Sequence, residues 1–284
     1  MTTGPALFGR VVSLTVGDRE FSDFRVQFAV KRTSRSKPNP AEITITGLSK
    51  ATREAISQRL TPVRLVAGYS GTAGQIFSGQ LDSVEIGREG TDWTTKIHAS
   101  DGRGAWRSYT GNAWRGGTPW ATVVQQLADS MGLAVPPSAV QAISGSARGP
   151  YTVSGYAWRE MDLLMATLGL QWSIQDGALQ VVQADKATDQ SVVLLTPQSG
   201  LVGVVRFTDP KISRVGKKRT LRKRSAIELD ALLQPEFTPG RYVRIESAVC
   251  TGDYRIDSVD HHGDSHSGQL LSTLACSGIN TGTA

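Results

Sequence analysis

Alternation of apolar and polar side chains dominates the first hundred residues and predicts β-strands there. Phe24, Val26, Phe28 and Val30 alternate with polar residues, which is the period of a strand with one face in water. The same pattern predicts further strands at 42–46, 63–67, 75–86 and 93–99. Ser49 lies at an N-cap position and predicts one short helix over 50–59.

Apolar residues change to a helical period beyond about residue 101. They recur at helical spacing over 120–131 and 158–168, and a glycine follows each predicted helix. Thr118 is the expected cap of the first helix, with Pro119 in its first turn. Asp176-Gly177 predicts a hairpin turn between two strands, 170–174 and 178–182. This middle part is therefore expected to be α+β.

The last part of the chain returns to β and echoes the first part. Strands are expected at 202–207, 226–232, 242–247, 253–259 and 269–276. Short motifs match in the same order and at nearly constant spacing: 63–65 with 243–245, 81–85 with 256–260, 97–100 with 274–277 and, more weakly, 41–43 with 226–228. Two unrelated sheets would share alternation but not this order, so the pattern favours an internal duplication.

These patterns together predict a mainly β protein with an α+β insert. Two similar β-barrel-like domains, 1–107 and 196–284, would flank a small α+β middle domain at 108–195. Three such chains around an axis would present six similar units with only three-fold chain symmetry. That geometry suits a device that joins a six-fold tube to a three-fold object.

Charge is concentrated in one segment of the chain. The net charge is +6, and the segment from 211 to 224 holds basic residues without an acidic one: Lys211, Arg214, Lys217, Lys218, Arg219, Arg222, Lys223 and Arg224. No aromatic residue is interleaved to stack on bases. A loop that docks on an acidic protein surface is the first interpretation, a solvated hairpin the second and DNA binding the third.

Candidate chemistry is sparse. His261, His262, Asp264 and His266 could ligate a metal, but their spacing fits no zinc module. A polar hairpin tip between strands ending at Val259 and starting at Gln269 explains them better. The sequence has no nucleophile elbow and no phosphate-binding glycine loop, and two cysteines are too few for a disulfide framework. We therefore expect no catalytic residue, no metal and no cofactor.

Aromatic and basic residues also cluster at 103–115, between the first two predicted domains. Packing between domains explains this segment, and a sugar-binding strip is the alternative. No apolar run is long enough to cross a bilayer and the N-terminus lacks signal-peptide features, so we expect no membrane insertion.

Short motifs along the chain resemble phage baseplate hub proteins, the late control gene D family of contractile-tailed phages. The resemblance is carried by 8–12, 24–33 and the segment Asn39-Pro40-Ala41 to Ser49, where the family has a strand, an "asparagine, any residue, alanine" turn, a second strand and a short helix. The helix around Gln125-Gln126, the turn at 168–172 and the motifs at 239–240, 252–256 and 262–264 are similar as well.

The resemblance implies a structural protein of the virion rather than an enzyme. It implies a homotrimer whose two tube domains per chain form a pseudo-six-fold ring, with the hexameric tail tube on one side and the trimeric spike on the other. Other baseplate proteins and a tape measure protein are further candidate partners, and genome DNA would contact the lumen only in passage. Assembly would take place in the host cytoplasm. Two alternatives stay open: a tail-tip enzyme acting on glycan or peptidoglycan, and a nucleic-acid-binding module built on the basic run.

Overall fold

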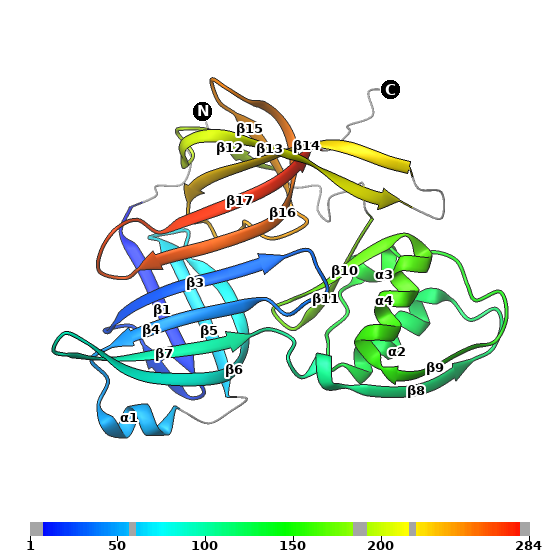
Figure 1. Ribbon diagram of the computed structural model, residues 1–284, viewed down its shortest axis with the longest axis horizontal. Coiled ribbons are helices and arrows are strands. Elements are labelled where there is room, and N and C mark those ends of the chain that lie inside the picture. Colours follow the sequence, from blue (N-terminus) through cyan, green and yellow to red (C-terminus); the bar gives the residue numbers. More distant parts are fainter. Residues whose placement is uncertain (1–7, 57–60, 184–191, 216–219, 279–284) are drawn as a thin grey trace.

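Three bodies make up the chain, and the first and last of them in sequence are β-barrels of similar design (Figure 1). The computed structural model describes residues 8–56, 61–183, 192–215 and 220–278, with side chains outside 209–225. The prediction of a mainly β protein, with two similar barrels and an α+β insert, is confirmed.

The first barrel holds seven strands and one short helix. Its elements are β1 (Arg10–Val16), β2 (Arg19–Phe21), β3 (Arg25–Thr33), β4 (Pro40–Thr46), α1 (Lys50–Ala55), β5 (Pro62–Tyr69), β6 (Gly74–Glu89) and β7 (Asp92–Ser100). The alternating apolar residues face inward as predicted, and Leu14, Ile43, Leu65 and Ile97 are fully buried. The helix ends at Ala55, earlier than the predicted 59, and residues 57–60 lie outside the described residues.

The middle body packs three helices against two two-stranded sheets, β8–β9 and the β10–β11 hairpin. Its elements are η1 (Ala105–Arg107), β8 (Tyr109–Trp114), α2 (Trp120–Ser130), α3 (Pro137–Gln141), β9 (Tyr151–Tyr156), α4 (Ala157–Leu168), β10 (Leu170–Gln175) and β11 (Ala178–Gln183). Thr118 does not cap α2 as predicted: Pro119 is the N-cap residue, and the Thr118 hydroxyl donates to the Arg115 carbonyl instead. No helix in the described parts of the chain is both long and apolar enough to cross a bilayer.

The second barrel holds the remaining six strands. They are β12 (Val192–Leu195), β13 (Leu201–Val215), β14 (Thr220–Leu232), β15 (Tyr242–Glu246), β16 (Thr251–Asp264) and β17 (Leu271–Gly278). Because Val193 and Leu195 of β12 pack into the core of this barrel, we propose that the third unit begins near residue 192 rather than at 196.

Both barrels use one strand order, which supports the predicted duplication. In the first, the order is β3-β4-β7-β6-β5-β1, and in the second β13-β14-β17-β16-β15-β12. The registers agree too: Val84 lies opposite Ile97 in β6–β7, and Val259 lies opposite Leu274 in β16–β17. Each of these ladders also has a register shift at the same place, around Asp82 in one and Asp257 in the other, and such bulges are specific features of a fold.

The ladders shift the weakest of the proposed sequence matches by one residue. Ile97 and Leu274 are equivalent, and their partners on the neighbouring strands are Ile43 and Leu229. The segment 41–43 therefore corresponds to 227–229, not to 226–228. A slip of one residue exchanges the two faces of a strand, so only the corrected match places both Ala41 and Ile43 on apolar residues.

A buried polar cluster fixes the middle body to the first barrel. The side-chain amide of Asn39, just before β4, donates to the Asp101 carboxylate at 2.9 Å and to the Ile174 carbonyl at 2.9 Å. The Asn39 backbone N–H donates to the same carboxylate at 2.7 Å, and Asn39 Oδ1 accepts from the Thr33 backbone at 2.8 Å. The asparagine of the hub-like turn motif thus holds three segments together.

Burial raises the pKa of Asp101 to about 6, even though the hydrogen bonds from Asn39 favour the carboxylate. Both oxygens of a carboxylate buried in this way need donors, and Asn39 supplies one to each.

We predict that Asn39→Ala lowers the free energy of unfolding by about 2–4 kcal/mol, because a buried carboxylate and a buried carbonyl each lose a donor. Urea unfolding at pH 7 measures the change. Asn112→Ala is the matched control, since this partly exposed amide makes only a 3.3 Å bond to Thr110; its effect should stay within about 0.5 kcal/mol. Equal effects of the two substitutions would contradict the role given to Asn39.

Candidate functional site: the joint between the barrels

The two barrels are joined by a β-ladder between β3 and β16, which we call the joint. It comprises residues 27–33 of β3 and 258–264 of β16, paired antiparallel from Ser258 opposite Thr33 to Asp264 opposite Gln27. β16 also pairs with β17 on its other side. One sheet therefore runs through both barrels in the order β13-β14-β17-β16-β3-β4-β7-β6, and Figure 1 shows β3 and β16 as its middle strands.

Ion pairs cross the joint on its open face, and the side chains on the other face, mostly apolar, are buried. Arg25 contacts Asp264 at 2.7 Å, and Lys31 contacts Asp260 at 3.4 Å. The Arg25 guanidinium is one reason why the pKa of Asp264 falls to about 2, against the opposing effect of burial. Exposed pairs of this kind add little stability, so the ladder and the buried face hold the joint.

Arg32 ties the joint to the middle body. Its guanidinium is buried and donates to Asp176 at 2.7 Å and to Gln175 at 3.2 Å, both in the β10–β11 turn. Asp176 in turn accepts from the Ser78 backbone of β6 at 2.9 Å. From the same hairpin, Gln180 donates to the Pro239 carbonyl at 2.8 Å. The hairpin thus contacts both barrels and braces them.

The histidine cluster predicted as a hairpin tip lies differently in the structure. β16 continues through Asp264, so His261 and His262 are strand residues and only 265–270 make the turn. As expected for neighbours on a strand, His261 is buried and His262 is exposed. Asp264 pairs with Arg25, and His266 Nδ1 lies 2.8 Å from the Ser265 hydroxyl. Within the described residues, no group of three or more potential ligands is arranged to hold a metal ion.

His261 is instead a buried neutral residue at the centre of the joint. Its Nδ1 lies 2.8 Å from the Ser272 hydroxyl on β17, and Val30 lies directly opposite it on β3. Burial, together with the nearby Arg32 charge, lowers the pKa of His261 to about 3. A charged imidazole at this position would therefore oppose folding.

The basic run lies on a β-hairpin rather than in a loop. Lys211 is opposite Arg224 and Arg214 is opposite Leu221 in the β13–β14 ladder, so Arg222 and Lys223 are also strand residues. Lys217, Lys218 and Arg219 lie outside the described residues. A docking role for the run stays a hypothesis.

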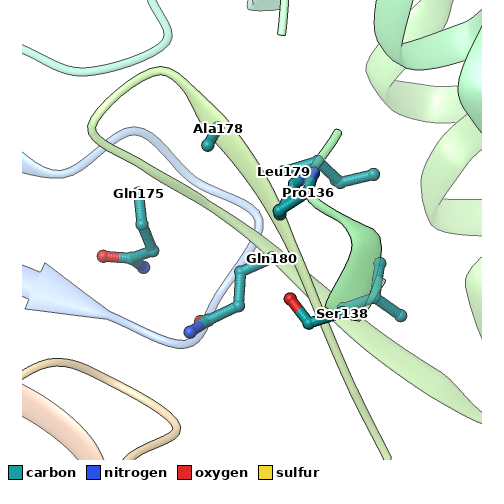
Figure 2. A pocket seen from close by; sticks show the side chains of 7 residues that line it. Pro136, Ser138, Gln175, Ala178, Leu179 and Gln180 are labelled. Atoms are coloured by element: carbon teal, nitrogen blue, oxygen red, sulfur yellow. The ribbon is translucent and has the colours of Figure 1, made fainter. Parts of the chain in front are cut away.

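Two shallow pockets lie near these elements. One has a volume of about 180 Å³ and lies between α3 and the β10–β11 hairpin (Figure 2); it is lined by Pro136, Ser138, Gln175, Ala178, Leu179, Gln180 and Val181. None of these side chains is ionisable, so none can serve as a general base or a general acid. The other, of about 230 Å³, lies over the joint, where Lys31 and Glu42 of its lining already pair with Asp260 and Lys96.

Packing accounts for the aromatic segment at 103–115. Trp106 stacks on Trp158 with ring centroids 4.3 Å apart, and Trp114 stacks on Tyr151 at 5.8 Å. Arg103 pairs with Asp82 of the first barrel. Of the aromatic residues in this segment, Tyr109 is the exposed one, so the segment does not form a continuous aromatic strip.

The joint is not predicted from the sequence, because the strand of β16 is expected there to end at Val259. The signal was present: Val259, His261 and Gly263 continue the alternation with Asp260, His262 and Asp264. The inward position in this alternation is occupied by His261, and histidine is seldom counted as a core residue. The pattern is therefore not recognised as a continuation of the strand.

We predict that His261 contributes a fall of about 1.4 kcal/mol per pH unit to the free energy of unfolding as the pH drops from about 6 towards 4, because its imidazole takes up a proton in the unfolded chain and not in the folded one. Asp101, whose pKa is raised on folding, contributes a slope of the opposite sign over this range, so the contribution of His261 is read as the difference in slope between the native chain and the variant. Since the pKa of His261 is lowered on folding, this stability is present above the unfolded pKa and is lost in acid. His261→Gln should flatten the dependence in urea titrations by that slope. His262→Gln, at the exposed neighbour, is the control, and an unchanged slope in His261→Gln would contradict the assignment.

No family model matches the sequence, and no curated protein matches it. Solved structures do match. The tail protein from Neisseria meningitidis superposes with a TM-score of 0.65, covering 95% of this chain and 97% of that chain at 11% identity. The 43 kDa tail protein of prophage MuSo2 from Shewanella oneidensis gives 0.64, covering 94% and 96% at 11% identity.

A component of the type VI secretion system of E. coli, which is itself structurally similar to the T4 tail proteins gp27 and gp5, is also similar. Its TM-score is 0.61, covering 94% of this chain and 77% of that chain at 9% identity. At such identities the likeness shows the fold. The resemblance expected from the short motifs is confirmed at that level: the chain has the fold of phage tail proteins and of a type VI secretion component.

Proposed function

We propose that this chain is a structural baseplate hub, which trimerises into a pseudo-six-fold ring joining the hexameric tail tube to the trimeric spike. The observation that carries the proposal is the pair of equivalent barrels linked by the joint within one sheet. Three copies arranged around an axis supply six similar barrels, which can meet a six-fold tube. The chains themselves keep three-fold symmetry, which matches a trimeric spike.

The rigidity of the joint supports this role. A ring that adapts two symmetries must hold its two barrels at a fixed angle, because a hinge between them would let the ring pucker. The β3–β16 ladder holds that angle, and the β10–β11 hairpin braces it through buried Arg32 on one barrel and Pro239 on the other. Strands paired on both sides and buried on one face open rarely.

The open face of the shared sheet would line the lumen. Its cations lie beside carboxylates: Lys96 contacts Glu42 at 2.7 Å, and Arg206 contacts Glu228 at 2.9 Å and Asp230 at 3.0 Å. DNA binds proteins largely by exchanging counterions for unpaired lysine and arginine. Because these lysine and arginine side chains already pair with carboxylates, the lumen surface would bind DNA weakly and would let the genome pass.

The proposed partners follow from the ring. The tail tube protein would stack on one rim and the spike on the other, with other baseplate proteins and a tape measure protein as further contacts, in the virion of a contractile-tailed phage assembled in the host cytoplasm. The basic hairpin of β13 and β14 extends out of the second barrel (Figure 1) and is the segment we propose for docking on an acidic neighbour.

We propose no enzymatic activity for the chain. The two pockets described above hold no free acid and base pair poised for catalysis, and the aromatic segment is used in packing. The alternative of a glycan-acting enzyme would need an exposed strip or cleft with a pair of carboxylates at catalytic spacing.

We predict that the chain mixed with the spike protein of the same tail forms a complex with three copies of each, because the ring and the spike share a three-fold axis. Native mass spectrometry measures the stoichiometry directly. The chain without the spike is the control for self-association. A stable complex with one or two copies of this chain per spike trimer would contradict the hub role.

A further inference from the structure

Two strand edges of the shared sheet are left unpaired, one along part of β6 and one along β13. β6 pairs with β5 only as far as Gln80, so its edge is free along 83–89, and β13 pairs only with β14. In the described part of the chain, neither edge has a partner strand on that side. Each carries a large exposed apolar residue: Ile86 is 49% exposed on β6, and Phe207 is 64% exposed on β13.

The internal repeat gives each edge a counterpart that is already paired. Ile86 lies opposite Thr95, as His261 lies opposite Ser272, so Ile86 corresponds to His261. Phe207 lies opposite Ile227, the equivalent of Ala41, which is the partner of Val30. Phe207 therefore corresponds to Val30.

In the joint, these two counterparts lie directly opposite each other. His261 is paired with Val30 in the β3–β16 ladder, and the two are 0% and 1% exposed. The joint is thus a paired version of a contact between two strands. The equivalents of those two strands, β6 and β13, each have an unpaired edge elsewhere in the same chain. These two edges do not meet within one chain, because six strands of the sheet lie between β13 and β6.

We propose that β6 of one copy pairs antiparallel with β13 of the next copy, in the register of the joint. Glu85 would lie opposite Thr208, Ile86 opposite Phe207 and Gly87 opposite Arg206. We apply the register of the joint to these three pairs only, because β13 has register shifts on either side of 206–208. The contact is head to tail, and repeating it closes a ring or grows a filament.

Burial and edge chemistry favour a second copy as the occupant. Open strand edges promote association unless something covers them, and this chain carries both halves of the contact. At the joint, Lys31 and Asp260 make an ion pair across the ladder; their equivalents, Thr208 and Glu85, can make a hydrogen bond there. That three copies close the ring rests on the proposed function, whereas the pairing of the two edges does not.

Disulfide trapping tests the register. In Glu85→Cys with Thr208→Cys, the two thiols would face each other between copies, within reach of a disulfide. The natural cysteines, Cys250 and Cys276, are buried and should not interfere. We expect mild oxidation of the concentrated full-length protein to give covalent species up to a closed trimer on a non-reducing gel.

Two matched pairs control the trapping. Lys31→Cys with Asp260→Cys is the equivalent pair inside the joint and should form an intrachain disulfide, with the protein staying a monomer on the gel. Ser83→Cys with Thr208→Cys is two residues out of register and should crosslink several-fold more slowly. Equal yields from the in-register and shifted pairs, or no interchain product, would overturn the proposed pairing of β6 with β13 between copies. A crosslinked ring with a number of copies other than three would support that pairing and overturn the trimer of the proposed function.

A second variant tests the contact without cysteines. Phe207→Asp should abolish self-association in sedimentation at the concentration where the native chain associates, while the melting temperature of the monomer stays unchanged because Phe207 is exposed. Leu163→Asp, which alters a residue 60% exposed on α4, is the matched control and should associate normally. Association of Phe207→Asp equal to that of the native chain would overturn the proposal.

Discussion

The pairing of β16 with β3 is the constraint on which the rest of the architecture depends, because it turns two barrels into one sheet. A linker alone would leave their relative angle free. Here the ladder fixes both angle and register, since sliding by one residue would exchange the buried His261 for the exposed His262. Because the imidazole of His261 is buried at this position, it must stay neutral, and its pKa is lowered to about 3.

The middle body stiffens this arrangement from outside. Its β10–β11 hairpin reaches the first barrel through Asp176, which bonds both Arg32 and the Ser78 backbone, and reaches the second through Gln180. Asn39 and Asp101 secure the base of the same hairpin through the Ile174 carbonyl. These contacts are polar and partly or fully buried, so they specify one geometry more strictly than apolar packing would.

Much of this fold could be predicted from the sequence, and the failures have physical causes. Period-two alternation found β3 to β7, and the order of repeated motifs found the duplication. The match at 41–43 was one residue out, because alanine and isoleucine are equally acceptable on a buried face and only the ladder fixes the register. β8 and β9 were missed because Gly111 and Gly155 interrupt their alternation.

The same limits apply to the site. The joint is built from pairings between residues more than two hundred positions apart, and no local pattern encodes which edges meet. The basic run drew attention as charge alone, whereas its backbone lies in a hairpin. Residues such as Asn39 and Arg32 carried a motif or a charge in the sequence, but their bracing role depends on partners in the middle body.

Electron microscopy of the assembled hub, viewed end-on, is the decisive test of the ring. We expect six similar lobes around an open lumen, with three protrusions from the middle bodies at alternate lobes. Averaging with three-fold symmetry should then sharpen the image, whereas six-fold averaging should blur the protrusions. A compact particle without a lumen, or a ring with an odd number of lobes, would contradict the account.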